Sequence, residues 1–184
     1  MFNFKFKLNH LIINNLNWYK AMQTTAYAPY SIETHCKISK VLDGDSFMVQ
    51  NIFSNCEKQI RLYGLDAPES KRNKKLIQDE KNTRLAGGFL IELGRKSTAF
   101  VLTIAPPGTT VTLITEQQYF YDFYNRQLAY IILPDGSCLN EILVAEGYAK
   151  VMDKYYCSNL AKYQQLNFLA KQNGRGLYAF TSQY

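Results

Sequence analysis

The side chains that could do chemistry in this chain are carboxylates, arginines and tyrosines, because histidine is confined to its first residues. Both histidines, His10 and His35, precede residue 36. A Ser–His or Cys–His hydrolase, a histidine-ligated zinc site and a histidine general base are therefore disfavoured in the main body of the chain. The four cysteines form no C-x-x-C pair, which also argues against zinc or thioredoxin-type chemistry.

Five charged residues stand where a purely structural domain would not require them. Asp45 follows a turn glycine, and Arg61 lies between two apolar residues of a strand-like segment. Asp66 and Glu69 flank a proline just beyond the end of that segment, and Arg126 follows a hairpin-type turn. Each has an ordinary structural explanation when taken alone, such as turn chemistry, an exposed loop acid or a solvent-facing arginine.

The elements that would position these residues are mainly strands. Strand patterns flank the turn at Asp43-Gly44-Asp45 and recur at 59–63, 111–115 and 127–133. Helical patterns are found at 95–104, 139–147 and 160–172, with a further one from Gln78 that Gly87-Gly88 interrupts. This order predicts an α+β, mainly β fold: a five-stranded barrel of the oligonucleotide-binding (OB) type with three flanking α-helices.

Ordered motifs along the chain resemble the staphylococcal nuclease (thermonuclease) family. They read Val-Leu-Asp-Gly-Asp-Ser-Phe at 41–47, Ile-Arg-Leu-Tyr-Gly-Leu-Asp-Ala-Pro-Glu at 60–69 and Tyr-Asn-Arg-Gln-Leu-Ala-Tyr at 124–130. Shorter matches follow at 135–136, 139–141, 143–144, 147–149 and 176–178. Several motifs in one order, with compatible spacing from 36 to 178, are more specific than any single motif. The family fold is an OB barrel with three helices, as the element order predicts.

The resemblance implies a role for each of the five charged residues. Asp45 and Asp66 would ligate a calcium ion, assisted by the backbone carbonyl of Ala67, where many family members have threonine. Glu69 would be the general base that activates or orients the attacking water. Arg61 and Arg126 would grip the scissile phosphate. Two tyrosines would line the nucleotide pocket, Tyr124 and Tyr155.

These roles agree with the chemistry of phosphodiester hydrolysis. Calcium prefers oxygen ligands, and a cation with two guanidinium groups can neutralise the charge that the phosphate gains in the transition state. A carboxylate base explains how such a reaction can proceed without histidine. The resemblance thus implies a Ca²⁺-dependent phosphodiesterase of the thermonuclease type, an endo- or exonuclease that cleaves DNA and RNA by in-line attack of water and leaves 3′-phosphates. The alternatives are a catalytically silent OB-fold module that binds nucleic acid, and a structural or interaction module.

Residues 70–93 depart from the family pattern, because this segment is longer than the short form of the loop that follows the general base. Its basic run, from Lys71 to Lys75, could track a nucleic-acid backbone. A solvated mobile loop is the alternative explanation.

In the family fold, the positions of the four cysteines suggest two disulfides. Pairing back from the Asp43-Gly44-Asp45 turn would bring Cys36 near Cys56, and Cys138 and Cys157 flank one predicted helix. We therefore state Cys36–Cys56 and Cys138–Cys157 as a hypothesis. Such bridges, together with the location that the family resemblance implies, favour a secreted or periplasmic protein.

The rest of the chain adds weaker indications. Residues 1–34 are interpreted as an N-terminal extension, or an atypical leader that lacks a continuous apolar region, and 35–184 as the nuclease-like domain. A net charge of +6 and a pI near 9.0 favour polyanionic partners. The short apolar runs predict no membrane span, and no obligate protein partner is evident.

Overall fold

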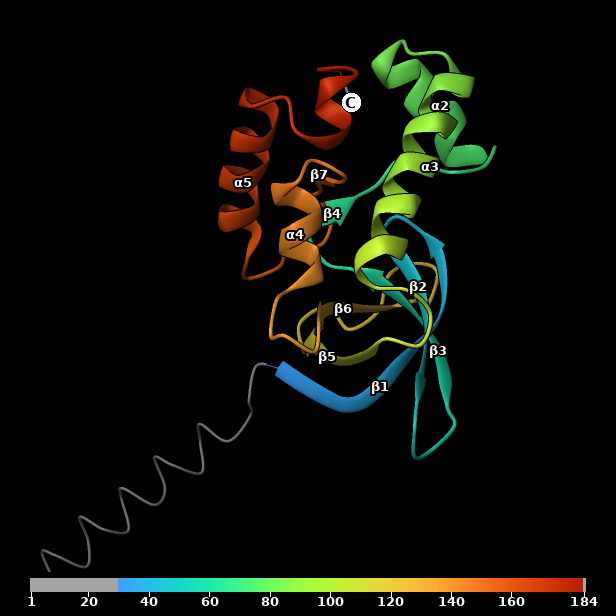
Figure 1. Cartoon of the computed structure of the whole chain (residues 1–184), viewed down its shortest axis with the longest axis vertical. Coiled ribbons are helices and arrows are strands. Elements are labelled where there is room, and N and C mark those ends of the chain that lie inside the picture. The colour runs from blue at the N-terminus through green and yellow to red at the C-terminus, as the bar shows by residue number, and fades with distance from the viewer. Residues whose placement is uncertain (1–29, 184) are drawn as a thin grey trace, which may run out of the picture.

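Five strands form a closed barrel in the computed structural model, which describes residues 30–183. The barrel order is β1-β2-β3-β6-β5, as Figure 1 shows in its lower half. The strands are β1 (Tyr30–Asp43), β2 (Ser46–Asn51), β3 (Glu57–Leu62), β5 (Thr110–Glu116) and β6 (Gln127–Ile132). The prediction of a five-stranded OB-type barrel is confirmed.

The long first strand closes the barrel by pairing on both sides. Its C-terminal half pairs antiparallel with β2, and its N-terminal half pairs antiparallel with β5. A register shift between Glu33 and Cys36 separates part of the β5 pairing, and His35 in this bulge has a positive φ of 58°. Strands β3 and β6 complete the circuit as the one parallel pair among the barrel pairings described.

The barrel interior is filled by side chains that alternate along the strands. Large apolar residues with no exposed surface come from all five barrel strands, namely Ile38, Phe47, Val49, Ile60, Leu62, Leu113 and Leu128. Burying each contributes about 1.5–3 kcal/mol relative to exposure. The interior is thus a packed core, and chemistry is left to the ends and outer surface of the barrel.

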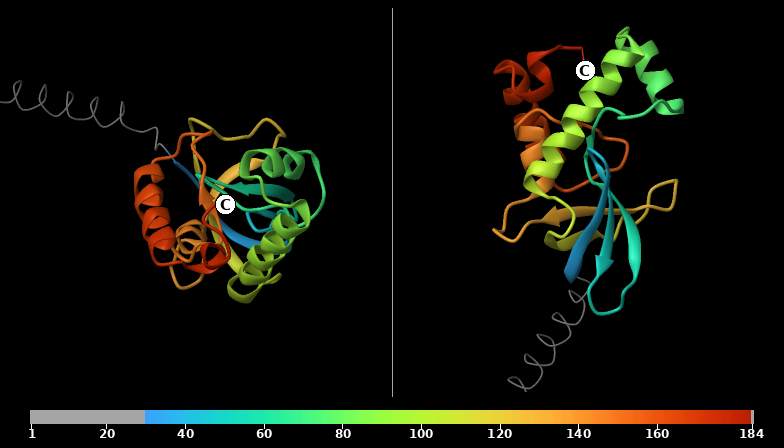
Figure 2. Two further views of the ribbon diagram at one scale, coloured as in Figure 1. Left: turned by 90° about the horizontal axis from the view of Figure 1, so that it is seen from above. Right: turned by 45° about the vertical axis from the view of Figure 1, so that its right-hand side comes forward.

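Helices gather at one end of the barrel, as the right-hand view of Figure 2 shows. They are α2 (Lys74–Thr83), α3 (Gly87–Ile104), α4 (Leu139–Ala145), α5 (Leu160–Gln172) and a short 3₁₀ helix, η1 (Gly176–Ala179). The two remaining strands, β4 (Leu65–Asp66) and β7 (Lys150–Val151), pair with each other beside these helices. Within residues 30–183, no helix combines the length and apolar character needed to cross a bilayer.

Three of these helices, α3, α4 and α5, correspond to the three predicted to flank the barrel. The fourth, α2, lies in the 70–93 segment and begins at Lys74 rather than at Gln78. Its start is fixed by Asn73, whose side-chain oxygen accepts a hydrogen bond from the Leu76 amide at 2.8 Å. Gly87 begins α3 instead of interrupting a helix, so α3 starts eight residues before the predicted Arg95. The mobile-loop explanation is therefore wrong for 74–83.

The N-terminal extension and the domain meet within β1. Because β1 begins at Tyr30, residues 30–34 pair with β5 and contribute to the barrel. Residues 1–29 lie outside the described part of the chain, and the interpretation of 1–34 as a leader therefore stays a prediction.

All four cysteines are free thiols in this structure, so neither hypothesised disulfide is formed. Cys36 is buried and pairs with Asn51 of β2, while the Asn51 amide bonds to the carbonyl of Cys56. Strand β2 therefore lies between the two cysteines, which explains why the first bridge does not form. Burial raises the pKa of Cys36 to about 11, which keeps it a neutral thiol. Cys157 is buried and Cys138 is partly buried, and both remain free.

Candidate active site

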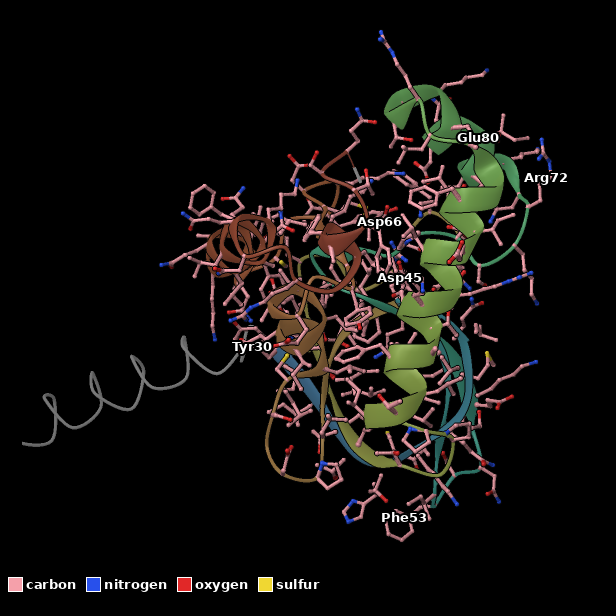
Figure 3. The ribbon with its side chains drawn as sticks, turned by 45° about the horizontal axis from the view of Figure 1, so that its top comes forward. Tyr30, Asp45, Phe53, Asp66, Arg72 and Glu80 are labelled. Carbon is pink, nitrogen blue, oxygen red and sulfur yellow. The ribbon has the colours of Figure 1, made fainter. Side chains whose placement is uncertain are left out.

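A cleft of about 600 Å³ collects the residues singled out from the sequence. Its lining includes seven of the eight predicted site residues, namely Asp45, Arg61, Asp66, Glu69, Tyr124, Arg126 and Tyr155. The eighth, Ala67, is buried next to Asp66. Figure 3 shows Asp45 and Asp66 in the centre of the molecule beside α3, while Phe53 marks the opposite end of the barrel.

Strand pairing places Arg61 between the two aspartates. Arg61 on β3 lies opposite Ser46 of β2, the residue that follows Asp45, and its guanidinium forms an ion pair with the Asp45 carboxylate. Its Nη2 also donates to Asp66 Oδ1 at 2.6 Å, because the chain turns at Gly64 and brings β4 back beside β3. All three side chains are less than one tenth exposed.

Asp45, Arg61 and Asp66 form a buried ion cluster in which the charge of each residue depends on the other two. Burial alone would lower the pKa of Arg61, but Asp45 and Asp66 outweigh that effect and raise it above its ordinary value. Burial would likewise raise the pKa of Asp66, but Lys75 and Arg61 lower it overall. Removing one partner would leave a buried charge uncompensated, so the cluster is rigid and sensitive to substitution.

Two glycines allow the loop after β4 to approach its neighbours closely. A Cβ at Gly94 of α3 would lie 2.4 Å from the carbonyl oxygen of Glu69, and a Cβ at Gly44 would lie 2.8 Å from the Cβ of Ala67. The Ala67 amide donates to Asp45 Oδ2 at 2.6 Å. The general-base candidate is thus fixed through its backbone to both α3 and the β1–β2 turn.

Both carboxylate oxygens of Glu69 are engaged by α2 and its cap. Asn73 Nδ2 donates to Glu69 Oε2 at 2.6 Å, and Lys75 Nζ lies 2.9 Å from Oε1. Lys75 also lies 3.0 Å from Asp66 Oδ1 and donates to the Ala67 carbonyl at 3.0 Å. Burial opposes its charge, but Asp66, Asp45 and Glu69 raise the pKa of Lys75 above its ordinary value.

These contacts test whether the predicted ligand set suits a cation. Oxygens of Asp66, Ala67 and Glu69 converge on one ammonium group, which is the environment a hard cation prefers. Within residues 30–183, no three His, Cys, Asp or Glu side chains form a metal-binding group by themselves. The predicted calcium ligands, Asp45, Asp66 and the Ala67 carbonyl, therefore stay a prediction.

Arg126 reaches the cleft from the other side, held by Asp122. The Asp122 carboxylate accepts from Arg126 Nε at 2.7 Å and lies 2.6 Å from Nη2, in a two-pronged ion pair. Asp122 also accepts the backbone amides of Tyr124 and Arg126, both at 2.9 Å. Arg126 Nη1 donates to Ser46 Oγ at 3.3 Å, which links it to the residue opposite Arg61.

The two predicted pocket tyrosines differ in exposure. The Tyr124 side chain is exposed, and the Arg126 guanidinium lies 5.5 Å from its ring centre. Tyr155 is buried, and its hydroxyl accepts a hydrogen bond from the Phe123 amide at 3.3 Å. Lys154 stands over the rings of Phe123 and Tyr155. This wall of the cleft combines aromatic faces with positive charge, a surface suited to nucleotides.

Sequence reasoning missed four residues that shape the cleft: Asp43, Asn73, Lys75 and Asp122. The sequence marks Lys75 only as part of the basic run from Lys71. Such a run does not indicate which lysine side chain faces the cleft. Asp122 precedes the Tyr124-Asn125 turn, where an aspartate commonly binds nearby amides, so turn chemistry could have identified it. Burial raises the pKa of Asp43, whose carboxylate accepts the Gly44 amide at 2.9 Å.

Sequence comparisons with known proteins assign the chain to a family. Residues 59–179 match the family described as staphylococcal nuclease homologues. A protein of Escherichia coli O157:H7 named an uncharacterized endonuclease is 30% identical over 147 residues, which cover 80% of this chain and 78% of that protein. A second Escherichia coli protein with that name aligns to the same extent. Endonuclease YhcR of Bacillus subtilis is 28% identical over 144 residues, 77% of this chain but only 11% of that much longer protein. The chain therefore belongs to the staphylococcal nuclease homologue family.

Proposed function

We propose that the protein is a calcium-dependent nuclease that hydrolyses phosphodiester bonds of DNA and RNA by in-line attack of water. Family membership and relatives named as endonucleases support the reaction class. The observation that carries the proposal is the cleft itself. Two arginines, two aspartates and Glu69 line one cavity of about 600 Å³.

The arginines and Glu69 divide the work on the phosphate. Arg61 and Arg126 enter the cleft from β3 and from the start of β6, so their guanidinium groups can donate to different oxygens of one phosphate. Such donors stabilise the charge that develops on the phosphate. Glu69 accepts a proton as the water oxygen forms its bond to phosphorus, and the bond from phosphorus to the 5′-oxygen breaks. Solvent supplies the proton to the leaving oxygen, so the products are a 3′-phosphate and a 5′-hydroxyl.

Asp45, Asp66 and the Ala67 carbonyl are the residues that would hold calcium. When bound, the ion supplies positive charge to the phosphate oxygens. Asp45 and Asp66 are held in place by Arg61, so this part of the ligand set is ordered in the free protein. The wall formed by Tyr124 and Tyr155 receives the nucleotide.

The alternative, a silent nucleic-acid-binding module, would not need Glu69. A nuclease assay on single-stranded DNA and RNA separates the two, with calcium or chelator and with Glu69→Gln. We expect cleavage only with calcium, and a loss of roughly 10²–10⁴-fold in Glu69→Gln. Glu92→Gln, the same change at an exposed position on α3, is the control and should cleave like the wild type.

Three outcomes would count against parts of the proposal. Cleavage in chelator would remove calcium from the mechanism, and full activity of Glu69→Gln would remove its base. Binding of nucleic acid without cleavage under any condition would favour the silent module.

A secreted or periplasmic location stays a prediction from the family resemblance alone. The free thiols of this structure give it no support. Mass measurement after alkylation of the protein unfolded without reductant tests the disulfide hypothesis: four modified thiols are expected from the structure, and none from a doubly bridged protein.

A further inference from the structure

The first turn of α2 inserts a positive charge among the oxygens assigned to calcium. Lys75 Nζ lies 3.0 Å from Asp66 Oδ1, 3.0 Å from the Ala67 carbonyl oxygen and 2.9 Å from Glu69 Oε1. Two of these groups belong to the proposed ligand set, and the third is the proposed general base. The contacts come from the 70–93 segment, where this chain departs from the short form of the loop.

The position of Lys75 is built by the helix that carries it. The neighbouring Leu76 is fully buried and packs in one cluster with Leu90 and Leu93 of α3. Asn73 caps the helix and also donates to Glu69 Oε2 at 2.6 Å. Helix packing, the cap and three oxygen contacts thus direct the ammonium to one place.

Lys75 nevertheless keeps a route to solvent. Its side chain is 36% exposed, whereas those of Asp45, Arg61 and Asp66 are less than one tenth exposed. The ammonium can therefore leave the oxygens without unfolding the helix, while the aspartates cannot follow it.

We propose that Lys75 is an internal competitor for the calcium site, which must withdraw before a divalent cation can bind. The inference rests on the proposed function. An ammonium group and a calcium ion repel each other and compete for the same oxygens, so each state of the site excludes the other. In the calcium-free protein Lys75 neutralises Asp66 and Glu69, and its withdrawal frees Glu69 Oε1 for water. The apparent Kd for calcium is the intrinsic Kd divided by the fraction of molecules in which Lys75 has left the site. The more often Lys75 fills the site, the weaker calcium binds.

Calcium titration calorimetry on the full chain tests the proposal without an activity readout. The variants are Lys75→Met, which keeps the aliphatic length, and Lys81→Met, which removes one charge from an exposed position on the same helix. We expect Lys75→Met to bind calcium roughly tenfold more tightly than the wild type. Lys81→Met should bind like the wild type.

Thermal unfolding and a second variant guard against misfolding of Lys75→Met. In chelator this variant should melt below the wild type, because its acidic cluster has lost a counter-charge, and calcium should raise its melting temperature by more than it raises that of the wild type. Asn73→Ala keeps Lys75 but removes the cap that directs it. It should tighten calcium binding in the same direction by a smaller factor.

The outcomes separate this inference from the proposed function. Equal, measurable affinities in wild type, Lys75→Met and Asn73→Ala would overturn the role of Lys75 and leave the calcium-dependent reaction intact. Absence of calcium binding in every variant would overturn both. Weaker binding in Lys75→Met would also contradict competition, since it would make the lysine a helper of the metal.

Discussion

Two arginines face one cleft from opposite surroundings. Arg61 lies inside the fold, 6% exposed, between the carboxylates of Asp45 and Asp66. Arg126 has a side chain that is 23% exposed, has Asp122 as its ion-pair partner and also donates to Ser46 Oγ, with its guanidinium 5.5 Å from the ring centre of Tyr124. In the first cluster Arg61 is shared by two carboxylates, with Lys75 as a second partner of Asp66, whereas the second cluster is a single ion pair.

This difference implies different roles: the buried Arg61 cluster holds the site together, whereas the more exposed Arg126 mainly contacts the substrate. Arg61 is held by strand pairing and by two buried charges, so its removal should damage both fold and chemistry. Arg126 is joined to one aspartate in a turn, so its removal should damage mainly the contact with phosphate. The two arginines can be told apart by measuring unfolding and cleavage on the same variants.

The largest effect is expected from Arg61→Ala. It would leave Asp45 and Asp66 buried without their shared partner, a change that costs about 3–5 kcal/mol in free energy of unfolding. Urea unfolding measures that loss, and cleavage should fall below detection. A variant with wild-type stability would show that Lys75 and solvent suffice to balance the two acids, which would remove the contrast with Arg126.

Arg126→Ala should lower the rate of cleavage strongly and the free energy of unfolding less than Arg61→Ala does. Loss of one phosphate donor lowers the rate by roughly 10²–10³-fold. The buried Asp122 keeps its two backbone amide donors but loses its counter-charge, so the free energy of unfolding should fall by about 1–3 kcal/mol, less than in Arg61→Ala, which strands two carboxylates. The same urea and cleavage measurements apply. If Arg126→Ala were destabilised as much as Arg61→Ala, both arginines would be parts of one structural cluster.

The sequence predicted the Arg61 side of the site better than the Arg126 side. Strand alternation and the motif at 60–69 carry Arg61, Asp66 and Glu69 on a single short segment, and the turn at 43–45 adds Asp45 through regular strand pairing. The barrel and α3 to α5 follow from periodicity and turn residues for the same reason, because local patterns determine them. Boundaries were weaker, since Gly87 was expected to interrupt a helix that in fact begins there.

Contacts between distant segments could not be predicted in this way. The inward turn of Lys75 depends on Leu76 packing against α3, a contact that no local pattern of the 70–93 segment encodes. The failed disulfide hypothesis has a similar origin, because it treated Cys36 and Cys56 as neighbours across one turn while β2 lies between them. In both cases local sequence patterns do not show which other element packs there, namely α3 against Leu76 and β2 between the two cysteines.

Asp122→Asn tests whether Asp122 acts through Arg126. The amide oxygen can still accept the backbone amides of Tyr124 and Arg126, but the ion pair with the guanidinium is lost. We expect a fall in kcat/KM of roughly tenfold, with a larger change in KM than in kcat because Arg126 is less well positioned for the substrate. Asp135→Asn, in an exposed turn, is the control. No loss in a double variant relative to Arg126→Ala would confirm that Asp122 acts only through Arg126.

The smallest effect is expected in the pH dependence of stability, which should distinguish Asp66 from its neighbour Asp43. The pKa of Asp66 is lowered in the folded state, so its ionisation stabilises the fold above about pH 4 and that contribution is lost as the pH falls below this value. The pKa of Asp43 is raised, chiefly by burial, so its ionisation has the opposite sign and opposes folding as the pH rises above about 4. Urea unfolding between pH 3 and 7 should therefore give Asp66→Asn a flatter acid limb than the wild type, and Asp43→Asn a steeper gain in stability from acid to neutral pH. Matching slopes in all three proteins would mean that Arg61 and Lys75 do not hold Asp66 in its charged form, and the contrast between the two arginines would then rest on burial alone.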